Sequence, residues 1–370
     1  MKHKKVELTE LFYDLVYVYA ISQITGLIHH LHHGVVAPYA FFSFALSLII
    51  FVNSWMVQTV YTNRFGSNSL VNICFMLAQM ILLMISATAM SLDWQENFAT
   101  IMLPMAAISG LLLLQYAVSY YQTDNPADKA FIKNFFVILG IRTLVLAVSV
   151  FLPYHLGLLC AAVGVVGTWI LPGVLGARGH AINAKSTQLN FPHLIERLSL
   201  LVIITFGEMI IGIAPFFKGE VLSIWSVLIF MIVASLFMVY IVEIDHLIDT
   251  NRKELTGNRA IYFHYLIFFG LSFITVALSF LEQSGVNLVF ATSVLYLGIG
   301  LVLLGTLLHN CYNKISHRIE SPLRWQLLLI YLISLVLTVL GRNVEVIILT
   351  TFISTLLMAV LMVRHNIQKS

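Results

Sequence analysis

The sequence has few charged residues. Asp, Glu, Lys and Arg make up only 10% of its 370 residues, whereas an average globular chain contains about 25%. Apolar residues make up 59%, more than a soluble domain of this length requires. This balance excludes an ordinary soluble protein. The apolar runs are long and continuous, without the short alternation of a β-barrel, so they predict an all-α polytopic membrane protein.

Cysteine is also scarce. The three cysteines, Cys74, Cys160 and Cys311, lie far apart in the sequence. They provide neither metal-ligand spacing nor a disulfide framework, and we interpret them as packing residues. The sequence contains no phosphate-binding loop, zinc-protease helix motif or nucleophile elbow. No cofactor is therefore expected, and nucleic-acid binding has no support.

The apolar residues fall into twelve segments, each near the length that crosses a bilayer core of about 30 Å. The basic start of the chain resembles the first part of a signal peptide, but Glu7, Glu10 and Asp14 interrupt the apolar residues that follow. We therefore expect an uncleaved first transmembrane helix. The predicted spans are 8–30, 38–61, 69–92, 97–121, 131–152, 155–176, 194–217, 221–247, 260–281, 286–309, 323–340 and 343–363.

Basic residues are distributed unevenly over the predicted loops. If the N-terminus is cytoplasmic, 17 of the 20 Lys and Arg residues fall on the cytoplasmic side. Lys218 and Arg342 fall outside, and Arg142 lies within a span. The positive-inside rule favours this orientation. Because both ends of the chain are basic, we predict an even number of spans and a cell-membrane protein with cytoplasmic termini.

A weak internal repeat accompanies these segments. Shifting the first predicted helix by 186 residues aligns Glu10 with Glu196 and also aligns two glycines. The tripeptide Thr-Asn-Arg occurs twice, at residues 62–64 and 250–252. Parallel repeats of this kind recur in transporters, whose binding sites lie at the repeat interface. The predicted repeats are two parallel six-helix units, residues 1–185 and residues 186–370.

Two carboxylates, Glu10 and Asp14, lie four residues apart in the first predicted helix. This spacing places both on one helical face. A charge deep in lipid is costly, so the face is expected to turn toward a protein interior or a watery cavity. For Glu10 and its repeat partner Glu196, stabilisation by the helix macrodipole is the alternative explanation.

A second polar face opens the seventh predicted helix, where His193, Glu196 and Arg197 follow the spacing i, i+3, i+4. One histidine beside an arginine does not make a zinc site, so we interpret this face as a cytoplasmic latch of polar pairs. An acidic patch near residues 243–249 faces the basic loops, and loop pairing is its default role. The residues assigned to a cytoplasmic mouth are Glu10, Asn63, Arg64, His193, Glu196, Arg197, Glu243 and Asp245.

These stretches resemble the bacterial low-temperature-requirement A (LtrA) family. The run Glu10-Leu-Phe-Tyr-Asp14-Leu-Val-Tyr-Val-Tyr-Ala20 is similar to the opening of that family. The His-Leu-Ile-Glu-Arg stretch at 193–197, followed by Gly207 and Glu208, is similar to a second family segment. The resemblance implies a multi-pass protein of the bacterial inner membrane. The family name refers to growth in the cold and implies neither a reaction nor a substrate.

Glu208 and Arg142 are the ionisable residues predicted to lie deepest in the membrane. Glu208 is about 12 residues, or about 18 Å, into its helix, near the middle of the bilayer core. Arg142 has a similar depth and needs a carboxylate, for which Glu208 and Asp14 are the candidates. We predict a central site of Asp14, Arg142 and Glu208. Structural roles, a salt bridge or a helix-to-helix hydrogen bond, remain open for each.

A histidine cluster ends the first predicted helix on the outer side. His29, His30 and His33 are weak candidates for binding a transition metal or sensing the external pH. No acidic ligands lie nearby in the sequence, and a solvated interfacial cluster is the alternative. We therefore predict no metal site.

Three hypotheses for function follow. The first is a secondary transporter or permease coupled to protons through Glu208 and Asp14, with Arg142 as a counter-ion or anion contact. The second is a membrane-embedded enzyme that acts on a lipid or envelope precursor. The third, suggested by the resemblance alone, is a non-catalytic factor for cold growth or membrane stress. The expected partners are membrane lipids, protons and a small solute.

Overall fold

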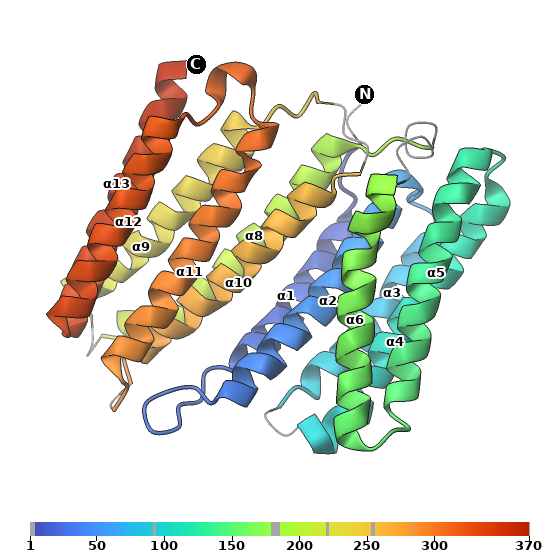
Figure 1. Ribbon diagram of the computed structural model, residues 1–370, viewed down its shortest axis with the longest axis horizontal. Helices are drawn as coiled ribbons and strands as arrows, with labels where there is room; N and C mark the ends of the chain where they lie inside the picture. The colour runs from blue at the N-terminus through green and yellow to red at the C-terminus, as the bar shows by residue number, and fades with distance from the viewer. Residues whose placement is uncertain are drawn as a thin grey trace. The chain divides into compact units, whose positions relative to one another are not determined.

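The computed structural model describes residues 4–91, 94–178, 186–219, 222–252, 256–283 and 285–369. These residues form twelve helices of at least 18 residues and no strand, which confirms the predicted all-α polytopic architecture (Figure 1). Eleven helices of the described chain are long and apolar enough to cross a membrane. The twelfth, α1 (Leu8–Gly26), carries polar residues, including Glu10 and Asp14, that lower its mean hydropathy.

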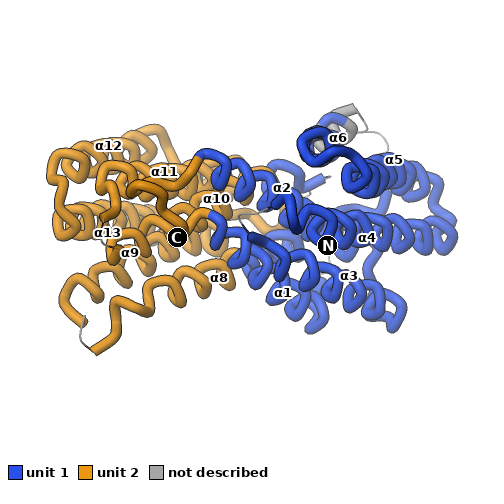
Figure 2. Tube along the Cα trace, turned by 90° about the horizontal axis from the view of Figure 1, so that it is seen from below, with its two compact units in different colours: residues 1–27, 38–201, 253–261 blue, residues 28–37, 202–252, 262–370 orange. Residues whose placement is uncertain are grey.

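Residue contacts divide the chain into two compact units (Figure 2). Unit 1 consists of residues 1–27, 38–201 and 253–261, and unit 2 consists of residues 28–37, 202–252 and 262–370. The proposed six-plus-six repeat remains a prediction. The helices of unit 1 are α1, α2 (Pro38–Arg64), α3 (Leu70–Thr88), α4 (Trp94–Gln122), α5 (Pro126–Ser149) and α6 (Tyr154–Arg178), with the start of α8 (Phe191–Ile213).

Helix α2 lies at the centre of unit 1. Of its most apolar window 78% is buried, against 22% for α6, so α2 is surrounded by protein. It packs on α1, α4 and α6, while α3, α4, α5 and α6 pack successively side by side (Figure 1). The buried surface of α2 includes the polar residues Asn53, Ser54, Gln58, Thr59, Thr62, Asn63 and Arg64. The interior of unit 1 is therefore partly polar.

Several helices begin at capping residues that the sequence provides locally. The side chain of Ser69 accepts a hydrogen bond from Asn72 N at the start of α3. Asn125 caps α5 in the same way and is followed by Pro126, which suits the first helical position. These caps satisfy backbone N–H groups that have no partner within the helix.

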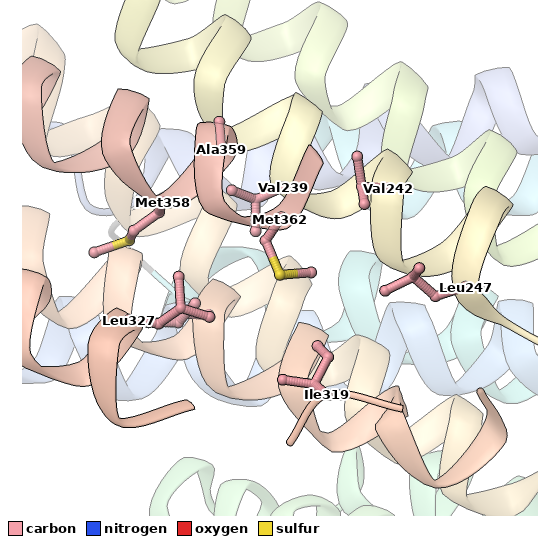
Figure 3. Close-up of a cluster of buried hydrophobic side chains, with 9 residues drawn as sticks. Val239, Val242, Leu247, Ile319, Leu327, Met358, Ala359 and Met362 are labelled. Atoms are coloured by element: carbon pink, nitrogen blue, oxygen red, sulfur yellow. The ribbon is translucent and has the colours of Figure 1, made fainter. Parts of the chain in front are cut away.

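Unit 2 contains the end of α8, α9 (Ile224–Ile241), a π-helical turn η2 (Val242–Leu247), α10 (Asn258–Phe280), α11 (Leu288–Leu308), α12 (Ser321–Gly341) and α13 (Val344–Lys369). Helix α13 packs along α9 and against α12. Their shared apolar core, which we call the α9–α13 core, is shown in Figure 3. Its members are Val239, Val242, Leu247, Leu303, Ile319, Leu327, Met358, Ala359 and Met362.

Two glycines allow α10 and α11 to approach closely. A Cβ atom built on Gly298 would lie 2.7 Å from the backbone oxygen of Gly270, and one on Gly270 would lie 2.6 Å from the oxygen of Gly298. Such distances are not tolerated, so only glycine fits at this crossing. Small residues at helix crossings are the usual means of close packing in membranes.

Replacing Gly298 by alanine should therefore destabilise unit 2. We expect a loss of about 1–3 kcal/mol, because the added methyl group overpacks against backbone atoms that cannot rotate away. The thermal unfolding midpoint of the purified protein in detergent measures this loss. Gly167→Ala in α6 is the matched control, since nothing lies within 4 Å of its Cβ position. Equal midpoints for the two variants would contradict the close crossing.

Candidate functional site

A buried cluster of acids and bases joins α1 to the start of α8 within unit 1. Glu10 and Asp14 on α1 face His193 and Arg197 on α8, so that two i, i+4 pairs meet. His193 Nε2 lies 3.1 Å from Glu10 Oε2, and Arg197 Nη1 lies 3.4 Å from Glu10 Oε1. Arg197 also donates from Nη2 and Nε to the two oxygens of Asp14, over 2.5 and 3.2 Å.

The cluster is shielded from solvent. Asp14, His193 and Arg197 have no exposed surface, and Glu10 is 4% exposed. Charges removed from water are stable only when they are paired and fully hydrogen-bonded. The two-pronged contact of Arg197 with Asp14 is the strong form of such a pair. Loss of one member would therefore leave the buried charge of another without its partner.

Helix α2 completes the surroundings of the ion pair. Trp55 Nε1 donates to Asp14 Oδ1 over 2.6 Å, and the guanidinium of Arg197 lies 5.2 Å from the Trp55 ring centroid. Arg197 Nη1 also reaches Thr62 Oγ1 at 3.5 Å. Since Trp55 binds the carboxylate and stacks on the cation, it fixes both partners of the pair.

The contact with Asn63 indicates which tautomer a neutral His193 adopts. Its side-chain oxygen accepts from Asn190 N and its Nδ2 donates to Asn190 O, each over 2.8 Å, so the orientation of the amide is fixed. The same Nδ2 lies 3.0 Å from His193 Nδ1. Nδ1 must therefore accept, which leaves the proton of a neutral imidazole on Nε2, where it is donated to Glu10.

This assignment gives the cluster an excess negative charge. Glu10 and Asp14 contribute two carboxylates, Arg197 contributes one positive charge, and His193 is neutral. Lys4 lies at the edge and donates to the backbone oxygens of Thr62 and Gly66. Burial lowers the pKa of Lys4, while the nearby carboxylates of Glu10 and Glu7 oppose that shift. Among the four side chains of the cluster there is thus one carboxylate more than there are cations, and Lys4 supplies a further positive charge at the edge.

A chain of amides continues inward from the cluster. Tyr13 donates to Gln79 over 2.7 Å, and Gln79 Nε2 reaches Gln58 at 3.2 Å and Gln115 at 3.4 Å. All four side chains are fully buried and come from four different helices, α1 to α4. Among the described residues, Gln58 Nε2 has no hydrogen-bond partner. Sequence reasoning missed this chain, although single glutamines within apolar spans were the available signal.

A small pocket of about 110 Å³ leads from the surface of unit 1 to Glu10. Its charged lining consists of Lys4, Glu7 and Glu10. Thr62, which contacts both Arg197 and Lys4, also lines it. The pocket therefore connects the edge of the cluster with the outside of the unit.

The structure shows contacts for two members of the predicted central site, Asp14 and Arg142. Asp14 contacts Arg197 and Trp55, whereas Arg142 donates to Ile50 O over 2.7 Å and to Ser54 Oγ over 2.6 Å. Glu208 is half-buried and belongs to unit 2, while Asp14 and Arg142 belong to unit 1. A common function of Asp14, Arg142 and Glu208 remains a prediction.

The residues of the predicted mouth fall into two groups. Glu10, Asn63, His193 and Arg197 contact one another as described above. Arg64 donates to Thr187 O over 2.6 Å and lies 4.3 Å above the ring of Phe131, so it anchors the chain that precedes α8.

The other members of the mouth lie apart from these contacts. Glu196 is half-buried on α8. Glu243 and Asp245 belong to unit 2, where Glu243 is buried and Asp245 is exposed. A shared functional role for all eight residues remains a prediction.

The three histidines of the predicted cluster lie in a loop of unit 2. His29 is half-buried with Nδ1 3.5 Å from Ser279 Oγ, and His30 and His33 are exposed. Burial is the main cause that lowers the pKa of His29. In the part of the chain that the structure describes, no group of three or more His, Cys, Asp or Glu residues is arranged to hold a metal ion.

Removing the positive charge of Arg197 should destabilise unit 1 strongly. Arg197→Met leaves Glu10 and Asp14 buried without compensation, at a cost of about 3–5 kcal/mol. Thermal unfolding in detergent measures the effect, with Arg324→Met at an exposed position of α12 as the control. Adding Glu10→Gln and Asp14→Asn to Arg197→Met should recover part of the loss. If Arg197→Met unfolds at the control's temperature, the ion pair contributes nothing.

Comparisons with known proteins agree with this sequence and fold. Residues 5–364, nearly the whole chain, match the model of the family described as bacterial low temperature requirement A protein (LtrA). No curated protein and no solved structure gave a match. The matched range includes α1 with Glu10 and Asp14 and the start of α8 with His193 and Arg197. The chain is a multi-pass membrane protein that belongs to the LtrA family.

Proposed function

We propose that this protein is a proton-coupled secondary transporter or permease of the cell membrane, with its termini in the cytoplasm. The observation that carries the proposal is the buried cluster of Glu10, Asp14, His193 and Arg197. Ionisable groups inside membrane proteins are costly, and they commonly mark proton relays and substrate pathways. A purely structural joint between two helices requires one ion pair, whereas this cluster has an additional carboxylate and an imidazole.

The excess negative charge gives the cluster a reason to bind a proton. With His193 neutral, one carboxylate charge is left without a balancing cation among the four side chains. A proton that reaches Glu10 through the adjoining pocket would balance the charge. The amide chain through Gln79 and Gln58 offers hydrogen-bonding groups further inside the unit, where a polar solute would need them.

Protonation of His193 would also move a helix. A second proton on Nδ1 would face the NH₂ group of Asn63, so the 3.0 Å contact would change from attraction to repulsion. Asn63 holds both the N–H and the C=O of Asn190, whose side chain caps the backbone N–H of His193. Proton binding would therefore loosen the attachment of α8 to α2, which is the coupling that a transporter requires.

Helix α8 links this cluster to the remaining candidates. Glu208 lies 11 residues after Arg197 on the same helix. We assign Glu208 and Arg142 to the solute side of the mechanism, with Arg142 as the contact for an anionic group.

The alternative, an enzyme acting on a lipid or envelope precursor, relies on acids that are accessible from the membrane interface. Asp14 is bound by Arg197 and Trp55, and Glu243 has no exposed surface. Neither carboxylate is presented to a lipid headgroup. This arrangement favours transport over interfacial catalysis.

Reconstitution into liposomes tests the proposal. Vesicles that contain a pH-sensitive dye and radiolabelled solutes, such as amino acids, carboxylates and quaternary amines, should show solute uptake accompanied by proton movement. Asp14→Asn and His193→Gln should largely abolish the proton movement, because each removes a group of the cluster. Glu345→Gln at an exposed position of α13 is the control and should behave like the wild type.

Two results would contradict the proposal. The first is wild-type vesicles that match protein-free vesicles for every solute and gradient tested. The second is solute uptake that continues unchanged, with equal proton movement, in Asp14→Asn and His193→Gln.

A further inference from the structure

Unit 2 contains a buried carboxylate that the proposed transport cycle does not use. Glu243 lies in the π-helical turn η2 and has no exposed surface. Among the described residues, neither of its carboxylate oxygens has a hydrogen-bond partner. An ionised carboxylate in this state carries a large desolvation cost, so a buried group with two unsatisfied oxygens requires an explanation.

The π-turn holds Glu243 firmly in this position. In η2 the hydrogen bonds run from residue i to i+5, as shown by the 3.3 Å bond from Ile248 N to Glu243 O. Residues five apart thereby come close together, and Val242 and Leu247 both enter the α9–α13 core (Figure 3). Single π-turns in α-helices are frequent at functional sites. The core therefore fixes the turn, and the turn keeps Glu243 inside.

A third oxygen without a partner among the described residues belongs to Asn313, whose side chain lies within reach of the Glu243 carboxyl group. Asn313 is 3% exposed, and its Oδ1 also has no partner within the described chain. Its backbone is paired with Ile248 in an isolated bridge, and Lys314 N donates to Leu247 O over 2.9 Å. The three buried oxygens thus belong to two segments, η2 and the stretch around Asn313, that are joined by backbone hydrogen bonds.

The neighbouring basic side chains are engaged elsewhere. Lys314 Nζ donates to His246 O over 2.8 Å, and Arg252 donates to Cys311 O over 2.6 Å while stacking on Tyr312. On η2 and the described part of the following loop, residues 248–252, the other charged residues are Asp245 and Asp249. These two acids add negative charge, which would draw a cation toward this end of unit 2.

The buried pair of His264 and His309 in unit 2 does not supply the missing charge either. His309 Nδ1 lies 2.8 Å from Gly305 O, so it must donate, and a neutral His309 then accepts at Nε2 from His264 Nδ1 over 3.1 Å. His264 Nε2 in turn accepts from the hydroxyl of Tyr240 at 3.1 Å. Each hydrogen bond is therefore satisfied with both rings neutral: Tyr240 donates to His264, His264 donates to His309, and His309 donates to Gly305 O. No imidazolium is needed here.

We propose that Glu243 and Asn313 form a binding site for a monovalent alkali cation, Na⁺ or K⁺. Carboxylate and amide oxygens are the ligands that hard cations prefer. One carboxylate balances one positive charge, whereas a divalent ion would leave a net charge buried. A protonated carboxyl group that donates to Asn313 Oδ1 is the alternative, and the cation dependence of the unfolding temperature distinguishes the two. This site does not depend on the proposed proton coupling in unit 1.

Cation-dependent stability tests the site in the full-length protein. A ligand that binds only the folded state raises the unfolding temperature with its concentration. The purified wild type in detergent should unfold at a higher temperature in NaCl or KCl than in choline chloride of equal ionic strength, and the increase should saturate. Glu243→Gln should lose this increase. The exposed neighbour variant Asp245→Asn should keep it.

If Glu243→Gln does not fold, a direct measurement of cation binding to the wild type tests the site instead. Equilibrium binding of radioactive Na⁺ should give one saturable site per wild-type chain, and Asn313→Ala should weaken that binding. Equal unfolding temperatures of the wild type in alkali and choline salts, with no saturable Na⁺ binding, would overturn the proposal. An unchanged cation response in a folded Glu243→Gln would also overturn it.

Discussion

The ion pair between Asp14 and Arg197 is the interaction on which unit 1 depends. Both side chains are fully buried, and neither charge would be stable alone in a largely apolar interior. Trp55 on α2 donates to Asp14 and lies beside the Arg197 guanidinium, so three helices meet at this pair. Glu10 and His193, one helical turn away on the same two helices, extend the pair into the four-residue cluster for which we propose proton exchange.

Much of this arrangement follows from the sequence. Twelve apolar segments correspond to the twelve long helices, because segment length and apolar content are direct requirements of the bilayer. The i, i+4 spacing of Glu10 and Asp14 correctly placed both on one buried face. The polar face of His193 and Arg197 was also recognised, since a charge at the entrance of a span is conspicuous.

The partners of these faces were harder to predict. Asp14 was one of the two carboxylates considered as partners of Arg142. It contacts Arg197, which was not considered for it, because spacing along one helix does not specify which helix packs against it. The orientation of Asn63 depends on the backbone of Asn190, 127 residues later. The glutamine chain and the π-turn at Glu243 arise in the same way, from contacts between distant segments.

The central claim is that His193 is a neutral, proton-accepting member of a buried negative cluster. Nitrogen-15 NMR of histidine-labelled protein in bilayers tests it directly, and the spectrum of His193→Gln identifies the signals of this residue among the 13 histidines. In alkaline buffer we predict an unprotonated Nδ1 and a protonated Nε2, with Nδ1 gaining a proton as the buffer is acidified. A His193 ring that is already doubly protonated in alkaline buffer, or that carries its single proton on Nδ1, would contradict the account.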